Sequence, residues 1–256
     1  MKVTFIGSGH GAPTKERYCQ CILIENGEDA YIVDAGAPLL DVLLRMDFDL
    51  KRLKGIFITH MHGDHFFGLP NLTDPAGWFY EDVDVDIYLP EKDLVDAYRK
   101  LYYLPEDSQR IRLKTSSEGT FYDQNGMKVT AFPNAHMSEP GRPSYGFLLE
   151  ADGQKIYISG DLDQNGSLDY SDIVNEEPTD LFIVECMHCS AEDLIKKLDD
   201  CKAKTVAFVH VYPESRYELL KDLQEKEDRY QVLPPVFQNN LIHSAASGGS
   251  WGSFEV

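Results

Sequence analysis

The residues best suited to chemistry lie between Thr59 and His65, directly after the apolar run 55–58. This stretch holds four potential metal ligands: His60, His62, Asp64 and His65. Imidazole and carboxylate groups are the ligands that zinc and related metals take in proteins. A strand that runs past Thr59 would point His60 and His62 the same way, and Gly63 would then turn the chain into a short helix. Ligands on both sides of a turn suit two ions about 3.5–4 Å apart better than one ion.

Four ligands do not fill two coordination shells, so further donors are expected elsewhere in the chain. Metal-type or acidic residues do follow other strand-like runs, namely His136, Asp161, Glu185 and His210. In open α/β sheets, ligands bind beyond the carboxyl ends of the strands. These residues are therefore predicted to belong to one site together with the first motif.

The run 59–70 resembles the signature of the metallo-β-lactamase superfamily, and more narrowly its ribonuclease Z and phosphodiesterase branch. Residues 5–9 and 33–36 resemble that branch as well, and the resemblance covers most of residues 1–217. It implies an α/β fold of the four-layered αββα sandwich type, formed by a single hydrolase domain over residues 1–256. It also implies two Zn²⁺ ions, with Mn²⁺ or Fe as alternatives.

The same resemblance implies a role for each candidate residue. The first zinc would be held by His60, His62 and His136, and the second by Asp64, His65 and His210. Asp161 would bridge the two ions, and Asp64 is also counted as catalytic. Glu185 and His188 resemble a further catalytic pair, in which His188 donates a proton to the leaving group and Glu185 orients it. An alternative reading of His188 is a residue at a helix start, because Ser190 and Asp193 form a capping pattern.

Two other binding sites remain open on the sequence. Residues 161–172 nearly match a calcium-binding EF-hand loop, although Asp172 stands where that loop has a glutamate and a strand-like run precedes it. The preferred reading is a turn-rich loop that leads into a helix near residues 171–175. Cys186 and Cys189 form a C-x-x-C pattern, but no second such pair completes a zinc site, and the five cysteines are expected to be free thiols.

The composition limits the class of substrate. The 256-residue chain has 24 basic and 43 acidic residues and a formal net charge of −19. Proteins that bind long nucleic acids usually present a basic surface, because neutralising phosphates supplies much of their affinity. A small substrate is therefore expected. No run of 18 apolar residues or signal-like start is seen, which favours a cytoplasmic protein. The resemblance also suggests a homodimer.

These observations predict a dinuclear-metal hydrolase, most simply a phosphodiesterase that uses a metal-bridging hydroxide on a small phosphodiester. The first alternative is a transfer-RNA 3′-processing endoribonuclease like ribonuclease Z. Such relatives carry a long tRNA-gripping arm between the third histidine and the bridging aspartate, whereas only 24 residues separate His136 from Asp161. Leu162 also stands where the relatives usually have threonine. The remaining alternatives are a thioester or lactone hydrolase and a non-catalytic metal-binding protein.

The predicted elements would position these residues at strand ends. Asn26-Gly27 and Asp152-Gly153 predict tight hairpins. Apolar spacing predicts helices over 39–46, 91–104, 190–201 and 214–226. The small, polar tail over 244–252 is expected either to dock through Trp251 and Phe254 or to be mobile.

Overall fold

The computed structural model describes residues 1–139, 141–233 and 253–256, and these divide into two compact units. The first unit holds Met1–Ser116 and the strand at residues 253–255. The second unit holds residues 117–233. Each unit contains one mixed seven-stranded sheet with helices, so the α/β composition predicted from the sequence is confirmed.

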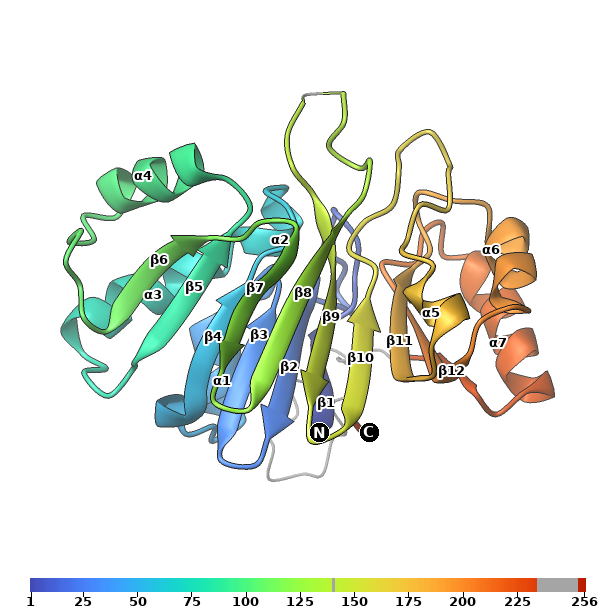
Figure 1. Ribbon diagram of the computed structural model, residues 1–256, viewed down its shortest axis with the longest axis horizontal. Helices are drawn as coiled ribbons and strands as arrows, with labels where there is room; N and C mark the ends of the chain where they lie inside the picture. Colours follow the sequence, from blue (N-terminus) through green and yellow to red (C-terminus); the bar gives the residue numbers. More distant parts are fainter. Residues whose placement is uncertain (140, 234–252) are drawn as a thin grey trace. The chain divides into compact units, whose positions relative to one another are not determined.

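The sheet of the first unit has the order β14-β1-β2-β3-β4-β5-β6 (Figure 1). Its strands are β1 (Lys2–Gly7), β2 (Cys21–Asn26), β3 (Asp29–Val33), β4 (Leu53–Phe57), β5 (Val85–Leu89), β6 (Ile111–Thr115) and β14 (Ser253–Glu255). The early strands pair antiparallel through hairpins, whereas β3 to β6 run parallel. The carboxyl ends of β3 and β4 therefore lie at the same edge of the sheet, where the histidine-rich motif begins.

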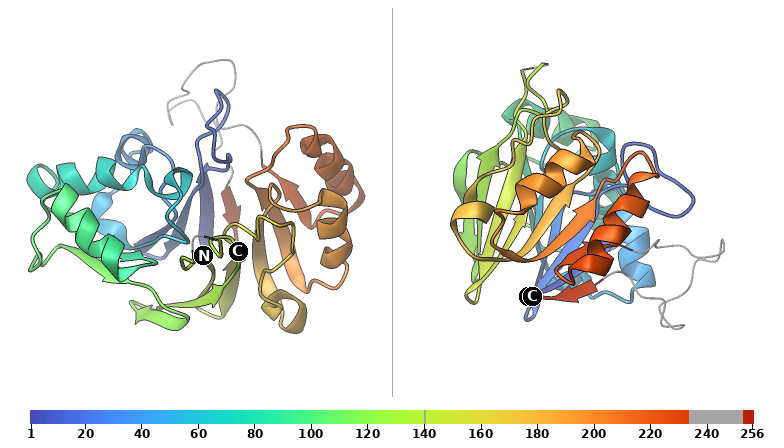
Figure 2. Two further views of the ribbon diagram at one scale, coloured as in Figure 1. Left: turned by 90° about the horizontal axis from the view of Figure 1, so that it is seen from above. Right: turned by 90° about the vertical axis from the view of Figure 1, so that its right-hand side faces the viewer.

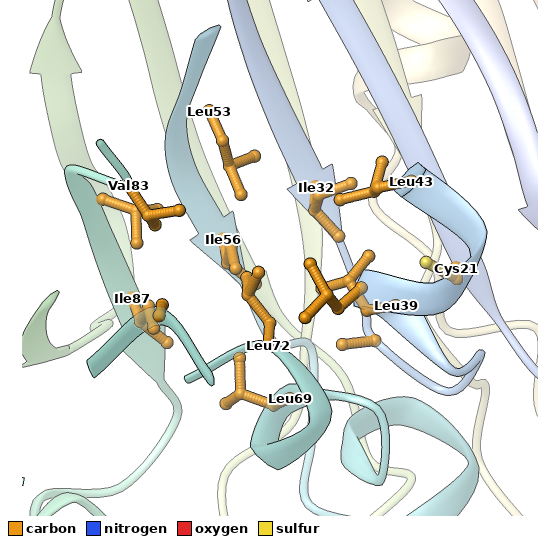
Figure 3. Packing of buried hydrophobic residues seen from close by; sticks show 14 of the residues in the cluster. Cys21, Ile32, Leu39, Leu43, Leu53, Ile56, Leu69, Leu72, Val83 and Ile87 are labelled. Atoms are coloured by element: carbon orange, nitrogen blue, oxygen red, sulfur yellow. The ribbon is translucent and has the colours of Figure 1, made fainter. Parts of the chain in front are cut away.

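Helices cover one face of this sheet and bury its apolar side chains (Figure 3). They are α1 (Leu39–Arg45), α2 (Gly63–Phe66), α3 (Leu69–Trp78) and α4 (Lys92–Leu101), with a 3₁₀ turn at Leu50–Arg52. Leu39 of α1 and Leu72 of α3 pack into the same cluster as Ile32 and Ile56 of the sheet. This packing anchors α3, which follows the metal motif directly along the chain.

The sheet of the second unit has the order β13-β12-β11-β10-β9-β8-β7. Its strands are β7 (Gly119–Gln124), β8 (Met127–Pro133), β9 (Tyr145–Ala151), β10 (Gln154–Ile158), β11 (Thr179–Glu185), β12 (Ala203–Val209) and β13 (Tyr230–Val232). Helices α5 (Ile173–Glu176), α6 (Ala191–Leu198) and α7 (Arg216–Lys226) share one apolar cluster with this sheet, and α6 and α7 lie beside it in Figure 2. Strands β10 to β13 are parallel, so their carboxyl ends deliver side chains to one edge.

Several sequence predictions are confirmed at this level, and one is wrong. Both predicted hairpins form, and Asp152 and Gly153 have the positive φ values of 51° and 78° that the tight turn requires. The four predicted helices form with shorter bounds. The strand before the metal motif was predicted to reach Thr59, and its continuation past Thr59 would have aligned His60 and His62, but β4 ends at Phe57. His60 and His62 therefore lie in a loop, and their placement depends on side-chain contacts instead of strand geometry.

Among the described residues, no helix is both long and apolar enough to cross a membrane. The expectations for residues 244–252, including Trp251, lie outside the described part of the chain. Phe254 lies in β14, where its backbone pairs with Val3. The prediction of a single domain over residues 1–256 stays a prediction.

We expect Leu72→Ala to lower the free energy of unfolding by about 2–5 kcal/mol, because it leaves a cavity in the helix-on-sheet core. Leu72 is fully buried in that cluster. Leu101→Ala is the matched control, since its side chain is 67% exposed and should change stability by less than about 0.5 kcal/mol. Urea denaturation of both variants measures the difference. Equal losses would contradict the packing described above.

Candidate metal centre

A buried carboxylate organises the metal motif of the first unit. Asp34 follows β3 directly, is fully buried and has a left-handed backbone with φ 58°. Its Oδ1 accepts hydrogen bonds from the backbone nitrogen of Thr59 at 2.8 Å and from the Thr59 hydroxyl at 3.0 Å. Its Oδ2 lies 2.8 Å from Nδ1 of His65. Burial raises the pKa of Asp34, and the contacts with His65 and Thr59 oppose that rise.

This network fixes the orientation of two imidazoles. An ionised carboxylate only accepts hydrogen bonds, so Nδ1 of His65 donates to Asp34 and Nε2 keeps its lone pair. The Thr59 hydroxyl donates to Asp34 and lies 3.1 Å from Nδ1 of His60, which is then the donor to Thr59. Both histidines thus present Nε2 as a base, the form in which imidazole binds a metal.

The four donors of this unit lie at distances suited to shared coordination. Nε2 of His60 lies 3.1 Å from Nδ1 of His62. Nε2 of His65 lies 3.4 Å from Oδ2 of Asp64. Two ligands of a tetrahedral zinc ion, each bonded at about 2.0–2.1 Å, are separated by about 3.3 Å. The spacing within each pair is therefore close to one edge of a coordination tetrahedron.

The backbone of the motif is held in place by the loop that follows β3. The amide of Ala35 donates to the carbonyl of His65 at 2.6 Å, and the amide of Gly36 donates to the carbonyl of Gln20 at 2.8 Å. A Cβ at Gly36 would overlap the carbonyl of Asp64, so only glycine allows this close approach. The loop and the motif consequently form one rigid assembly within the first unit.

In the second unit, three imidazoles surround the buried carboxylate of Asp161. Oδ2 of Asp161 lies 3.5 Å from Nε2 of His210, 3.7 Å from Nε2 of His136 and 3.9 Å from Nδ1 of His188. Hydrogen bonds between such atoms are shorter, at about 2.7–3.2 Å. Imidazole nitrogens and a carboxylate oxygen that converge at these distances suit a cation between them. The chemistry of this donor set therefore fits a divalent metal ion.

Two of these histidines are oriented by neighbouring groups. Nδ1 of His136 donates to the carbonyl of Leu162 at 2.8 Å, which directs its Nε2 toward Asp161. The amide of Leu162 donates in turn to Oε1 of Glu185 at 3.0 Å. His210 has a left-handed backbone with φ 52° at the end of β12. The rule that found these residues is a metal-type side chain at or shortly after a strand end. Glu185 is the last residue of β11, His210 follows β12 directly, and His136 and Asp161 are each the third residue after β8 and β10.

Glu185 and His188 are in contact, as predicted. Nδ1 of His188 lies 3.1 Å from Oε1 of Glu185, and the Glu185 carboxylate also accepts from the amides of Met187 and His188. Nη1 of Arg216 donates to the carbonyl of Cys186 at 2.8 Å, which braces the turn between the pair. The capping pattern is present as well, because Ser190 accepts from the amide of Asp193 at 3.3 Å. The helix cap and the pairing of His188 with Glu185 therefore coexist.

In the loop that resembles a calcium site, carboxylate oxygens accept hydrogen bonds from backbone amides. The two carboxylate oxygens of Asp169 accept from the amides of Asp163 and Ala135, at 2.9 and 2.5 Å. Oδ1 of Asp163 accepts from the amide of Asn165 at 3.0 Å. Helix α5 follows from Ile173 to Glu176. These contacts fit the turn-rich loop better than a calcium cage.

All five cysteines are free and buried, in line with the sequence prediction. Cys186 and Cys189 are hydrogen-bonded to each other, and this bond lowers the pKa of Cys186. Among the residues that the structure describes, neither belongs to a group of three metal-type side chains. The structure therefore gives no support to a zinc site at Cys186 and Cys189.

Comparison with known proteins identifies the family. The family model described as anti-Pycsar protein Apyc1 matches residues 1–225. The chain belongs to the Apyc1 family. Within the metallo-β-lactamase superfamily, this Apyc1-family chain falls in the ribonuclease Z-like branch, as the motif predicted.

Curated relatives of this Apyc1-family chain are ribonucleases Z. The protein from Staphylococcus saprophyticus is 30% identical over 262 residues, which cover 95% of this chain and 81% of the relative. The protein from Methanocaldococcus jannaschii is 29% identical over 154 residues, which cover 59% of this chain and 47% of the relative. The chain thus spans about half the length of the first curated relatives it matches.

Solved structures confirm the metallo-β-lactamase fold. The metallo-β-lactamase fold protein YhfI from Bacillus subtilis aligns with a TM-score of 0.73 at 18% identity, covering 92% of this chain and 98% of YhfI. Human tRNase Z, short form, aligns with a TM-score of 0.65 at 24% identity, covering 82% and 93%. Zinc-bound PqqB from Methylobacterium extorquens aligns with a TM-score of 0.62 at 14% identity, covering 92% and 98%.

The structure places the predicted residues in two groups. His60, His62, Asp64 and His65 converge in the first unit, and His136, Asp161, Glu185, His188 and His210 converge in the second. Sequence reasoning assigned no role to Asp34, although it follows the apolar strand β3 directly, as His210 follows β12. The strand-end rule would have found it.

We expect Asp34→Asn to weaken metal binding by about 10- to 100-fold, the usual effect of removing a group that orients a histidine ligand. An amide in place of the carboxylate sets an N–H donor against either Thr59 or His65, both of which now donate to Asp34. Asp47→Asn is the matched control, since Asp47 is exposed and has the same left-handed backbone, with φ 52°. Zinc competition against a fluorescent chelator measures both affinities, and equal values would contradict this role.

Proposed function

We propose that this chain is a metal-dependent phosphodiesterase that hydrolyses a small cyclic nucleotide. The observation that carries the proposal is the convergence of His136, His188 and His210 on the carboxylate of Asp161 at 3.5–3.9 Å. The match to the Apyc1 family over residues 1–225 supports a cyclic-nucleotide substrate. The acidic net charge of −19 also favours a small substrate over a long polyanion.

We propose that seven side chains hold two zinc ions in the arrangement that the superfamily implies. They are His60, His62 and His136 for one ion, Asp64, His65 and His210 for the other, and Asp161 as the bridge. When bound, the ions would supply Lewis acidity for the phosphate and a water nucleophile available near pH 7. The Asp34 network supports this assignment, because it presents Nε2 of His60 and His65 as neutral bases.

The chain's own contribution to the proton transfer is proposed to come from His188. Its Nδ1 contacts Glu185, whose negative charge favours the protonated imidazole. The protonated ring can give its proton to the alkoxide that leaves when the phosphodiester bond breaks. Glu185 is proposed to orient the ring, and Arg216 to hold the intervening turn through the carbonyl of Cys186.

Transfer-RNA 3′-processing remains the second candidate, favoured by ribonuclease Z relatives at about 30% identity. The segment between His136 and Asp161 weighs against it. Residues 145–158 of that segment form the β9–β10 hairpin, which leaves only the short loop before Tyr145. The arm that such enzymes are expected to carry there does not fit in that length.

Metal analysis of Asp161→Ala tests the proposed bridge. We expect the zinc-loaded wild-type protein to hold two ions per chain, and the variant to lose at least one ion and about 10³-fold or more in kcat/KM. Asp172→Ala is the control, because its side chain is exposed at the start of α5. Retention of both metals and full turnover by Asp161→Ala would rule out this centre.

A substrate panel separates the candidate activities. Purine and pyrimidine 3′,5′-cyclic nucleotides, a precursor tRNA, a thioester and a lactone are compared at equal enzyme concentration. We expect turnover of the cyclic nucleotides to exceed the others, because the site is proposed to act on a small phosphodiester. Preferential cleavage of the precursor tRNA would favour the second candidate instead, and no turnover with metal bound would favour a non-catalytic role.

The role of His188 is tested with leaving groups of different basicity. We expect His188→Ala to lose about 10²- to 10⁴-fold in kcat on a cyclic nucleotide, whose alkoxide leaving group needs a proton. The loss should be much smaller on bis(p-nitrophenyl) phosphate, because p-nitrophenolate leaves without protonation. Equal losses on the two substrates would argue against proton donation.

A further inference from the structure

An exposed aromatic ring lies directly on the metal motif of the first unit. Phe67 follows helix α2, and its side chain is 71% exposed. A Cβ at Gly63 would overlap atoms of the Phe67 ring, so the ring rests against the α-carbon between His62 and Asp64. Single exposed apolar residues are common on proteins, and the exposure alone carries no argument. The contact with the glycine inside the ligand motif does.

Hydrogen bonds hold the backbone that carries this ring. The amide of Phe67 donates to the carbonyl of Gly63 at 2.8 Å, and the amide of Gly68 donates to the carbonyl of Ala35 at 2.6 Å. A Cβ at Gly68 would overlap the carbonyl of Ala37, so the chain is pressed against the loop after β3. The Phe66 ring lies 5.8 Å from the Phe67 ring and 6.4 Å from the Tyr98 ring, and it packs against the apolar cluster of the first unit. Phe66 is partly buried against the core, whereas Phe67 is exposed to solvent.

We propose that Phe67 is a binding residue on which the heterocyclic base of the nucleotide stacks. The inference rests on the proposed phosphodiesterase function and specifies how the base of its substrate is bound. A phosphate held by metals on this motif would lie close to Phe67, because the exposed Phe67 ring contacts Gly63 within the motif. Stacking on an aromatic side chain tolerates every base, since each has a π-face. The contact therefore favours nucleosides over base-free phosphodiesters without selecting one base.

The test compares substrates with and without a base. Wild type, Phe67→Ala, Phe67→Leu and Phe67→Trp are assayed on 3′,5′-cyclic nucleotides and on the 3′,5′-cyclic phosphate of methyl riboside. Phe67→Ala should raise KM for the nucleotides about 5- to 100-fold and leave kcat within about threefold, as loss of uniform binding predicts. Phe67→Leu should behave similarly, and Phe67→Trp should preserve the wild-type KM. KM for the base-free compound should not change.

A binding readout and a matched control complete the design. The dissociation constant of a slowly hydrolysed cyclic nucleotide phosphorothioate should rise with KM in Phe67→Ala, while the zinc content stays at the wild-type value. Phe79→Ala removes the same side chain from a site that is 81% exposed beyond α3, and it should change neither quantity.

Three results would overturn the inference. They are an unchanged KM in Phe67→Ala, an equal rise for the base-free compound, and a loss of zinc that accounts for the whole effect. Failure of the wild-type protein to hydrolyse any cyclic nucleotide would overturn the proposed function itself, and the stacking role with it. The measurement on the wild-type protein therefore distinguishes failure of the stacking inference from failure of the proposed function.

Discussion

The first unit depends on how one buried negative charge is satisfied. Removing a carboxylate from water is costly unless hydrogen bonds replace its hydration. Asp34 obtains them from Thr59 and His65. The same contacts that stabilise the charge set the rings of two candidate ligands. Stability and ligand geometry are consequently one requirement here, because neither can change without the other.

In the second unit, different groups orient the candidate ligand histidines. A backbone carbonyl, that of Leu162, orients His136, and the carboxylate of Glu185 supports it from behind through the Leu162 amide. Glu185 also contacts His188, so a single side chain links a proposed metal ligand with the proposed proton donor. Carbonyl and carboxylate acceptors are the usual partners of ligand histidines. In both units, therefore, hydrogen bonds from Nδ1 to an oxygen acceptor orient candidate ligand histidines.

The sequence predicted the candidate site better than its surroundings. Residues such as Asp161 and His210 could be found because parallel strands deliver their ends to one edge, a rule that needs no coordinates. Strand β7 was missed, since its residues alternate weakly, although Asn125-Gly126 marks the turn after it. The early end of β4 at Phe57 and the exposure of Phe67 were not predictable, because both depend on contacts with loops distant in sequence.

The left-handed backbone at Asp34 and His210 has an evolutionary cost. Non-glycine residues pay for this conformation, and glycine or asparagine would adopt it more easily. Neither replacement could supply the carboxylate or imidazole that these positions provide. At position 34 such a replacement would also lose the hydrogen bonds of the carboxylate to Thr59 and His65, so selection for folding retains Asp34. At position 210, a laboratory lineage evolved only for thermal tolerance is expected to gain stability while giving up the imidazole.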